Sequence, residues 1–267
     1  MQIAAYFAAT LIGLSLGMIG AGGSILTVPV LVYLAGVEPV LATGYSLFVV
    51  GSTALVGGVK SLRRGMVNLR TAVMFGVPSI LAVYATRLWL MPVIPETLFS
   101  VGGFALSKGT GLLILFAVLM VATSLSMIRD KKVQAEEAAA DHEGRNILYV
   151  FAEGVGVGVL TGMVGAGGGF LIIPALVLLA GLEMKVAVGT SLFIIAAKSL
   201  TGFIGDVQNG EVIDWPFLAL FTGFSIAGIF LGSWLAAYVN GNKLKKAFGW
   251  FVLAMGIYMI ARETLFK

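Results

Sequence analysis

The stretch "GMIGAGGSILTVPVLVYLAG", from Gly17 to Gly36, places a glycine-rich loop directly before a short apolar segment. A membrane helix normally avoids such a loop, because each interior glycine costs roughly 1 kcal/mol of helix propensity relative to alanine. The chain nevertheless repeats the pattern as "GMVGAGGGFLIIPALVLLAG", from Gly162 to Gly181. The repetition indicates that the interruption has a purpose in both places.

The similarity extends beyond these two stretches. Residues 13–60 align without gaps on residues 158–205, and 22 of the 48 positions are identical. Chance similarity between two apolar stretches would not match glycines, a proline, a glutamate and a serine together. These matches include Gly17/Gly162, Gly20/Gly165, Gly22/Gly167, Gly23/Gly168, Pro29/Pro174, Glu38/Glu183 and Ser46/Ser191. The chain is therefore predicted to consist of two halves of one design.

The composition is that of an integral membrane protein. Of 267 residues, 59% are hydrophobic and 11% are charged, and the mean hydropathy is +1.02, whereas a soluble domain carries about 25% charged residues. The net charge of +4 comes mostly from loops, so it reports membrane topology rather than nucleic-acid binding. The sequence lacks cysteine and contains only one histidine, His142, so we expect no metal site and no cofactor. It also lacks H-E-x-x-H, G-x-S-x-G and Walker motifs, which argues against an enzyme or an ATP-driven pump.

Apolar runs predict an all-α protein of ten membrane segments, with the second and seventh unusually short. Thirteen or fourteen helical residues span about 20 Å, against about 30 Å of hydrocarbon. These two segments are therefore half-helices, re-entrant pieces or steeply packed short spans. The ten expected segments are 3–20, 24–36, 40–60, 70–92, 103–128, 146–164, 169–182, 185–205, 215–239 and 244–263.

Five segments in each half predict that the second half enters the membrane upside down. Residues 1–128 form the first repeat, 129–145 a cytoplasmic linker, and 146–267 the inverted second repeat. The loop at 60–70 and the linker are rich in Lys and Arg, which favours the cytoplasmic side. The equivalent loop of the second half, "GDVQNGEVID", has neither residue type and should be external. Ten crossings then place both termini outside.

Inverted repeats with paired interrupted helices are typical of secondary transporters, whose substrate sites lie near the bilayer midplane. The helices that restart after the two loops expose unbonded N–H groups and the positive end of the helix dipole. Two converging N-termini would bind an anion without any charged side chain. The alternative is that the glycines only permit close helix packing, as we expect for Gly13-x-x-x-Gly17 and Gly158-x-x-x-Gly162. The candidate binding residues of the loops are Gly20, Gly22, Gly23, Ser24, Gly165, Gly167, Gly168 and Gly169.

Three side chains complete the predicted site. Ser46 and Ser191 occupy equivalent positions after the loops, although a buried hydroxyl often bonds only its own helix. Lys198 lies about seven residues inside the outer end of its segment, where an ionisable residue usually marks a pathway. Its repeat partner is Thr53, so Lys198 breaks the symmetry. The alternative is that Lys198 snorkels to the outer headgroups.

Other charged residues receive structural interpretations. Arg87 and Lys108 lie nearer to segment ends, and for them we expect snorkelling. Glu38 and Glu183 lie at equivalent bends, where a helix N-cap role is favoured and a proton-coupling role stays open. No Asp, Glu or His lies in the middle of a predicted segment, so a buried carboxylate proton relay is not expected.

The doubled G-x-G-G loop with its downstream proline, followed by "ATGYSLF" and "AVGTSLF", resembles the two signature halves of the TauE/SafE sulfite-exporter family. The resemblance covers essentially the whole chain. It implies a multi-pass permease of the bacterial or archaeal plasma membrane, for sulfite, other sulfur oxyanions or organosulfonates.

The sequence thus predicts a secondary-active transporter that carries a small, sulfur-containing anion by alternating access, driven by an ion or substrate gradient. The coupling ion stays open, with H⁺ and Na⁺ as the candidates. A passive anion channel and a non-transporting scaffold subunit are the alternatives. The expected partners are the anion and the lipid bilayer, without nucleic acid. The direction of transport and the oligomeric state stay open.

Overall fold

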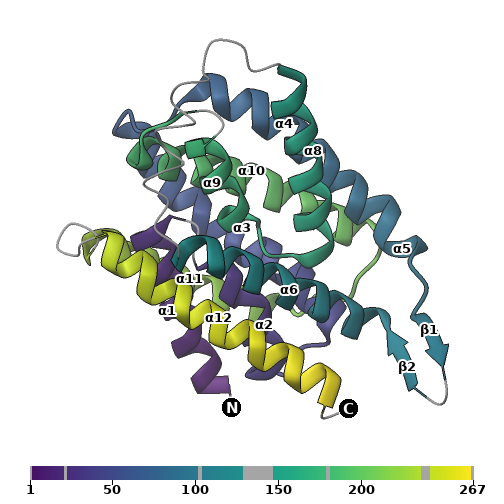
Figure 1. The fold of residues 1–267 in the computed structure, drawn as a ribbon. Helices are drawn as coiled ribbons and strands as arrows, with labels where there is room; N and C mark the ends of the chain where they lie inside the picture. The colour runs from purple at the N-terminus through teal and green to yellow at the C-terminus, as the bar shows by residue number, and fades with distance from the viewer. Residues whose placement is uncertain are drawn as a thin grey trace.

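A computed structural model describes residues 2–20, 23–101, 104–128, 147–178, 181–235 and 241–265. These residues form a helical bundle with one small β-hairpin (Figure 1). The elements are α1 (Gln2–Ile19), α2 (Ser24–Tyr33), α3 (Pro39–Arg63), α4 (Leu69–Ala85), η1 (Thr86–Leu90), α5 (Met91–Val93), β1 (Thr97–Val101), β2 (Phe104–Ser107), α6 (Lys108–Ile128), α8 (Ile147–Val164), α9 (Gly169–Leu178), α10 (Met184–Gln208), α11 (Trp215–Leu235) and α12 (Gly241–Leu265).

Several helices have the length and the apolarity that a membrane span requires. Within the described residues there are five such spans, at 39–63, 69–93, 108–125, 185–208 and 215–235. Further apolar helices at 4–19, 24–33 and 151–164 are shorter. The chain is therefore a multi-pass membrane protein, in agreement with the composition.

Helices α3 and α10 pack against each other in the middle of the bundle. In each, 67% of the most apolar window is buried, against 39% in α4 and α11. Later residues of α3 contact earlier residues of α10, since Gly51 packs against Leu200 and Gly58 against Phe193. The two helices are therefore antiparallel.

One contact between the halves occurs twice, with the roles of the two halves exchanged. Gly20 of the first loop packs against Val188, and Gly165 of the second loop packs against Thr43. In each pair the glycine and its neighbour sit at positions that the repeat makes equivalent. The two halves therefore pack against each other through equivalent contacts.

The glycine pairs in α1 and α8 serve close helix packing, as expected. A Cβ at Gly13 or Gly17 would meet the backbone of α11, and one at Gly158 would meet the backbone of α4 at Ser79. Helix α1 packs along α11, and α8 packs along α4. Small residues let these backbones approach, which matters because lipid gives helices little hydrophobic drive to associate.

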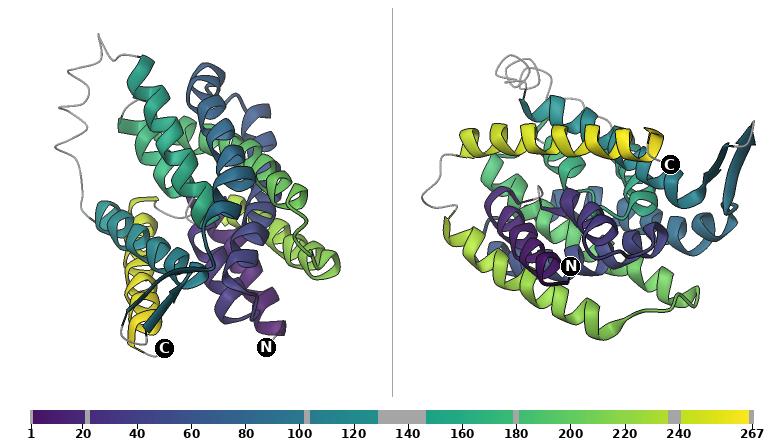
Figure 2. Two further views of the ribbon diagram at one scale, coloured as in Figure 1. Left: turned by 90° about the vertical axis from the view of Figure 1, so that its right-hand side faces the viewer. Right: turned by 90° about the horizontal axis from the view of Figure 1, so that it is seen from below.

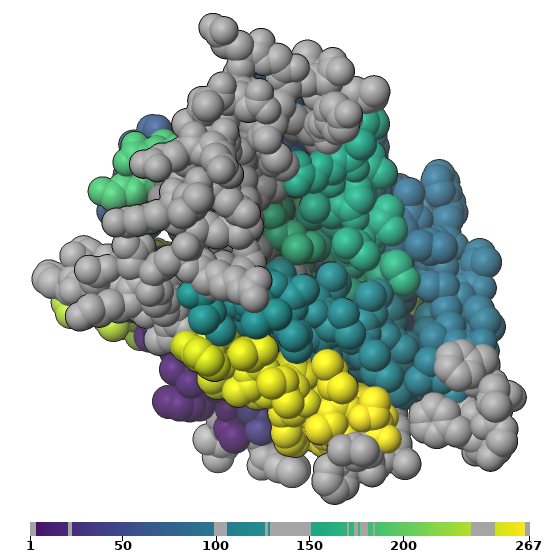
Figure 3. Space-filling view, in the orientation of Figure 1, coloured from purple at the N-terminus to yellow at the C-terminus, as the bar shows by residue number. Residues whose placement is uncertain are grey.

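A separate layer is formed by α6 and α12, which lie side by side across one face of the molecule (Figure 3). The β-hairpin leads into α6. Both chain ends and the hairpin lie at the same end of the bundle (Figure 2).

The structure corrects the predicted segments at several places. The segment predicted at 103–128 begins as strand β2 and becomes helical only at Lys108, so the protein is not purely α-helical. Strand β1 pairs with β2 in an antiparallel register. The two short segments form helices of ten residues each. The linker at 129–145 lies outside the described residues.

Two glutamates begin the long central helices. The side chain of Glu38 accepts a hydrogen bond of 3.0 Å from the Leu41 backbone N–H, which caps α3. Glu183 holds the equivalent N-cap position of α10, without a side-chain cap bond. The N-cap interpretation is thus confirmed in detail for Glu38.

Candidate functional site

The second glycine loop and Lys198 lie together in the protein interior. The Lys198 side chain is fully buried, and its Nζ donates a hydrogen bond of 3.0 Å to Thr161 Oγ1 on α8. A Cβ at Gly168 would stand only 2.6 Å from Lys198 Nζ. The loop therefore leaves room for the ammonium group only because residue 168 has no side chain.

The loop needs glycine for its backbone as well. Gly165 and Gly168 have φ angles of +73° and +66°, a left-handed region that costs other residues roughly 1–2 kcal/mol. A Cβ at Gly165 would also overlap Thr43, and one at Gly168 would overlap Thr161. Conformation and close approach thus both require glycine in this loop.

The charge of Lys198 is poorly compensated. Lys198 sits near the middle of α10, and it does not snorkel to the lipid headgroups, because no part of it is exposed. An ammonium group carries three N–H donors, and Thr161 is the one acceptor found for it among the described residues. The single ion pair in that part of the chain joins two other residues. A buried cation with free donors is a group that an anion would stabilise.

The predicted hydroxyls differ in what they bond. Ser191 donates to the Val188 carbonyl of its own helix at 2.8 Å, so its proton is already used. The Ser46 hydroxyl is buried and has no hydrogen-bond partner within the described residues. Ser46 lies between Thr43 and Val50 on α3, which contact Gly165 and Gly167 respectively. Ser46 is therefore the better placed of the two beside the second loop.

A further hydroxyl, which the sequence did not single out, belongs to Ser199. It is buried, lacks a partner in the described part of the chain, and would lie 3.3 Å from a Cβ at Gly167. The residues around the second loop thus offer Ser46, Lys198 and Ser199 as polar groups. Gly169 begins α9 directly after this loop.

The first glycine loop has a different environment. Gly20 has a φ angle of +84° and packs against Val188, ten residues before Lys198, or about 15 Å along α10. Gly23 precedes α2 without a side-chain cap bond, and Ser24 is buried at the start of that helix. Gly22 lies outside the described residues. Lys198 thus contacts the second loop, and the described part of the first loop packs elsewhere on α10.

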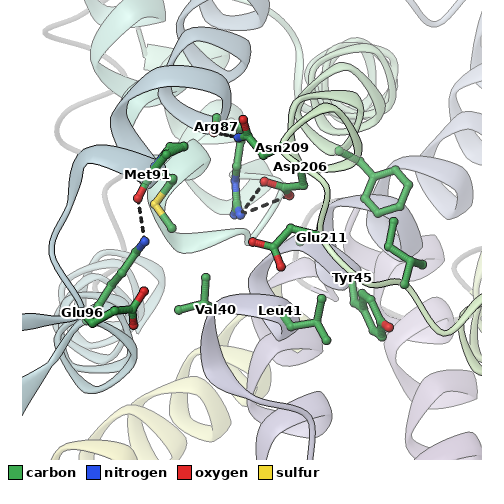
Figure 4. Close-up of a pocket in the computed structure, with 14 residues that line it drawn as sticks. Val40, Leu41, Tyr45, Arg87, Met91, Glu96, Asp206, Asn209 and Glu211 are labelled. Atoms are coloured by element: carbon green, nitrogen blue, oxygen red, sulfur yellow. Dashed lines mark hydrogen bonds and ion pairs between the residues drawn. The ribbon is translucent and has the colours of Figure 1, made fainter.

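A cavity of about 250 Å³ opens at the ends of α3, η1 and α10 (Figure 4). Because one water takes about 30 Å³ of liquid volume, the cavity has room for a small oxyanion with some of its hydration. Its charged lining residues are Arg87, Glu96, Lys108, Asp206 and Glu211. Arg87, Asp206 and Glu211 point toward one another across it (Figure 4).

The expectation that Arg87 snorkels is wrong, because its side chain is only 1% exposed. Its Nη1 lies 3.3 Å from Asp206 Oδ2 and donates to Thr43 Oγ1 at 3.0 Å. The Nε and Nη2 groups have no hydrogen-bond partner among the described residues. Arg87 belongs to the π-helical turn η1, an irregularity that often occurs at functional sites.

Lys108 is also buried rather than snorkelling. It is 7% exposed, and its Nζ donates to the Met91 carbonyl at 2.6 Å. Asp206 was expected in the external loop "GDVQNGEVID". Instead, α10 continues to Gln208, and the Asp206 carboxylate is buried. Arg87 and Asp206 are 119 positions apart, so no local pattern could pair them. The unusual acidic residue at the end of an apolar run was the available signal.

The described residues contain no group of three or more His, Asp or Glu side chains that could hold a metal ion. The polar groups found here are hydroxyls, two lysines, an arginine–aspartate pair and two glutamates, inside a multi-pass helical bundle. That inventory fits a protein that binds and moves a small solute.

The profile of the family "Sulfite exporter TauE/SafE" matches residues 5–259. The chain belongs to this family. It is 31% identical over 256 residues to a probable membrane transporter protein of Xylella fastidiosa, with 95% of this chain and 92% of the relative covered. It is 29% identical to the probable membrane transporter protein YunE of Bacillus subtilis, with 91% and 89% covered.

An archaeal relative, the probable membrane transporter protein MJ0441 of Methanocaldococcus jannaschii, is 33% identical over 117 residues, which is 42% of this chain and 43% of the relative. No solved structure matches the chain. The TauE/SafE family is one of membrane transporters rather than of enzymes, and the resemblance noted from the glycine motifs is thereby confirmed.

Proposed function

We propose that this protein is a secondary-active transporter for a small anion, a sulfur oxyanion or an organosulfonate such as sulfite, in a bacterial or archaeal plasma membrane. The observation that carries the proposal is the buried Lys198 ammonium, which has one hydrogen-bond acceptor and no carboxylate partner among the described residues. Burying a charge is costly unless it is paired. An anion between Lys198 and the second glycine loop would supply the missing partner.

The anion would be held by three kinds of group. Lys198 contributes the charge, and Ser46 contributes a hydroxyl that has no partner within the described residues. The start of α9 at Gly169 contributes backbone N–H groups and the positive end of a helix dipole. The first loop, with Gly20 to Ser24, would line the opposite side in another state of the transport cycle.

Alternating access is supported by the matched contacts between the halves. The antiparallel α3–α10 pair, and the equivalent contacts of Gly20 and Gly165, are what two inverted repeats would make. In such transporters one repeat rocks against the other around a fixed site. We therefore propose the inverted five-plus-five architecture, with both termini and the 209–214 loop external.

Cysteine labelling tests that topology, and the chain has no native cysteine to interfere. Val212 is 86% exposed, so Val212→Cys should react with an impermeant thiol reagent from the external side. Gln134→Cys in the linker should react only from the cytoplasmic side. Labelling of both positions from one side would contradict the inverted repeat.

Ligand-dependent stabilisation tests the substrate class. The purified protein is heated with sulfite, thiosulfate, sulfate, taurine or sulfoacetate, and we expect at least one sulfur anion to raise the melting temperature. The same panel with Lys198→Ala should give no shift, whereas Lys185→Ala, an exposed lysine on the same helix, should behave as wild type. No shift with any anion would favour a non-transporting scaffold.

Turnover separates a transporter from a channel. Alternating access involves conformational steps of microseconds to milliseconds or slower. A flux far above about 10³ per second without counter-ion dependence would therefore favour a passive channel.

A further inference from the structure

We propose that Asp206 is the proton-coupling group of this transporter. The arriving anion takes the Arg87 guanidinium from Asp206, and Asp206 accepts a proton as it loses its counter-charge. This inference rests on the proposed function, and it names the coupling ion that the family assignment leaves open.

The Arg87–Asp206 contact is incomplete as an ion pair. A fork-to-fork pair uses two guanidinium nitrogens, at about 2.7–2.9 Å. Here Nη1 alone faces both carboxylate oxygens, at 3.3 Å and 3.4 Å, and it also donates to Thr43. The Nε and Nη2 groups have no partner among the described residues, although Arg87 is only 1% exposed. Two nitrogens of the guanidinium are thus buried without a hydrogen-bond acceptor, and an oxyanion that takes Arg87 from Asp206 would supply one.

The cavity gives the anion a place beside the Arg87–Asp206 pair. Arg87 and Asp206 both line the space of about 250 Å³ (Figure 4). The carboxylate fits there because residue 44 is glycine, since a Cβ at Gly44 would stand 2.8 Å from Asp206 Oδ2. Asn209 Nδ2 donates to the Arg87 carbonyl at 2.9 Å, which fixes the π-helical turn against the end of α10. The backbone is therefore held while the side chains can exchange partners.

The charges around the cavity explain why a proton must accompany the anion. Besides Arg87 and Asp206, the charged groups that line the cavity are Lys108 from α6, Glu96 from the segment before β1, and Glu211 from the loop after α10. Two cations therefore meet three carboxylates. Lys108 already donates to the Met91 carbonyl. An entering anion would add a further negative charge to a lining that is already negative by one.

Asp206 is the carboxylate that takes the proton, because it is the one the anion displaces. Its side chain is 11% exposed, whereas Glu96 and Glu211 are exposed to solvent. A buried carboxylate without a counter-charge favours its neutral form. The exchange is Arg87⁺·Asp206⁻ + anion⁻ + H⁺ → Arg87⁺·anion⁻ + protonated Asp206, with the charge of the site unchanged.

A line of contacts joins this cavity to Lys198. Arg87 donates to Thr43, Thr43 packs against Gly165, and Gly168 at the other end of that loop packs against Lys198. In this proposal the anion passes from Arg87 to Lys198 along the second glycine loop when these contacts open during the transport cycle. The proton carried by Asp206 would be released when the Arg87 pair re-forms.

Calorimetry of sulfite binding to the full-length protein in detergent, in buffers of different ionisation enthalpy, tests the proposal. Sulfite's own titration is common to all variants, so differences between proteins report protein groups. Wild type should take up about one proton more per bound sulfite than Asp206→Asn. For each unit rise in pH, the sulfite affinity of wild type should accordingly fall about tenfold more than that of Asp206→Asn.

Matched variants identify the group. Asp214→Asn makes the same chemical change eight positions later, in the loop after α10, and keeps the N-cap of α11, so it should behave as wild type. Asp206→Glu should retain the proton uptake. Loss of uptake in Glu211→Gln instead of Asp206→Asn would overturn the assignment to Asp206. Equal uptake in wild type and in every variant would overturn proton coupling at this cavity.

Two further outcomes are possible: Asp206→Asn fails to fold, or wild type fails to bind sulfite. If Asp206→Asn does not fold, because Arg87 is left unpaired, the double variant Arg87→Gln/Asp206→Asn removes both charges and should fold. Its sulfite binding should be weak and should lack the extra proton, and retention of that proton would overturn the proposal. If sulfite and the other sulfur anions fail to bind wild type at all, the proposed function fails, and the inference fails with it.

Discussion

Replacing Lys198 by methionine should stabilise the protein in the absence of anion and abolish its response to anion. An ion buried without a counter-charge costs several kcal/mol after relaxation. The hydrogen bond from Nζ to Thr161 returns about 1.5–3 kcal/mol of that cost. Methionine has a similar length and no charge, so Lys198→Met should gain about 2 kcal/mol. For a chain of this size that corresponds to a rise of about 4–8 °C in melting temperature.

Sulfite should reverse the order of stability of wild type and Lys198→Met. At about 100 times its dissociation constant, a ligand that binds only the folded protein adds about 2.7 kcal/mol, which should bring wild type to or above Lys198→Met. Melting curves of both proteins over a sulfite titration measure the crossing, with Lys185→Met as the exposed-lysine control. The reasoning is refuted if Lys198→Met is less stable than wild type without anion and gains the same stability from sulfite.

Two further substitutions test the packing of the site. Asp206→Ala should lower the free energy of unfolding by about 3–5 kcal/mol, because it leaves the buried Arg87 without a counter-charge. The double variant Arg87→Met/Asp206→Leu should recover most of this loss. An additive double-mutant cycle in chemical unfolding would show that the pair does not interact. Gly165→Ala should cost well over 2 kcal/mol, because it combines about 1–2 kcal/mol of backbone strain with an overlap on Thr43. Gly36→Ala, whose Cβ would meet nothing within 4 Å at a φ angle of +72°, should cost only the strain, and equal melting temperatures for the two variants would contradict this account.

The repeat carried most of the fold prediction. Glycines that recur at a fixed offset predicted both loops and the two short helices after them, because backbone geometry demands glycine at the same places in each half. The packing of α3 against α10 was not predicted. The hairpin was missed because its residues are apolar enough to extend the run before α6. The adjacent Gly102 and Gly103 in the sequence were a hairpin signal that hydropathy alone conceals.

The site was only partly accessible from sequence. Lys198 stood out because a lysine deep in an apolar run usually has a functional role. The structure places it against Gly168. Arg87 and Asp206 were not recognised as a pair, because charges near segment ends normally reach the headgroups. The packing of η1 against the end of α10 brings the two residues into contact.

Uptake of radiolabelled sulfite into proteoliposomes is the most direct test of anion transport through the Lys198 site. Wild type and Lys185→Met should accumulate sulfite at the same rate, and Lys198→Met should be at least about tenfold slower. Equal uptake by Lys198→Met and wild type would contradict the account.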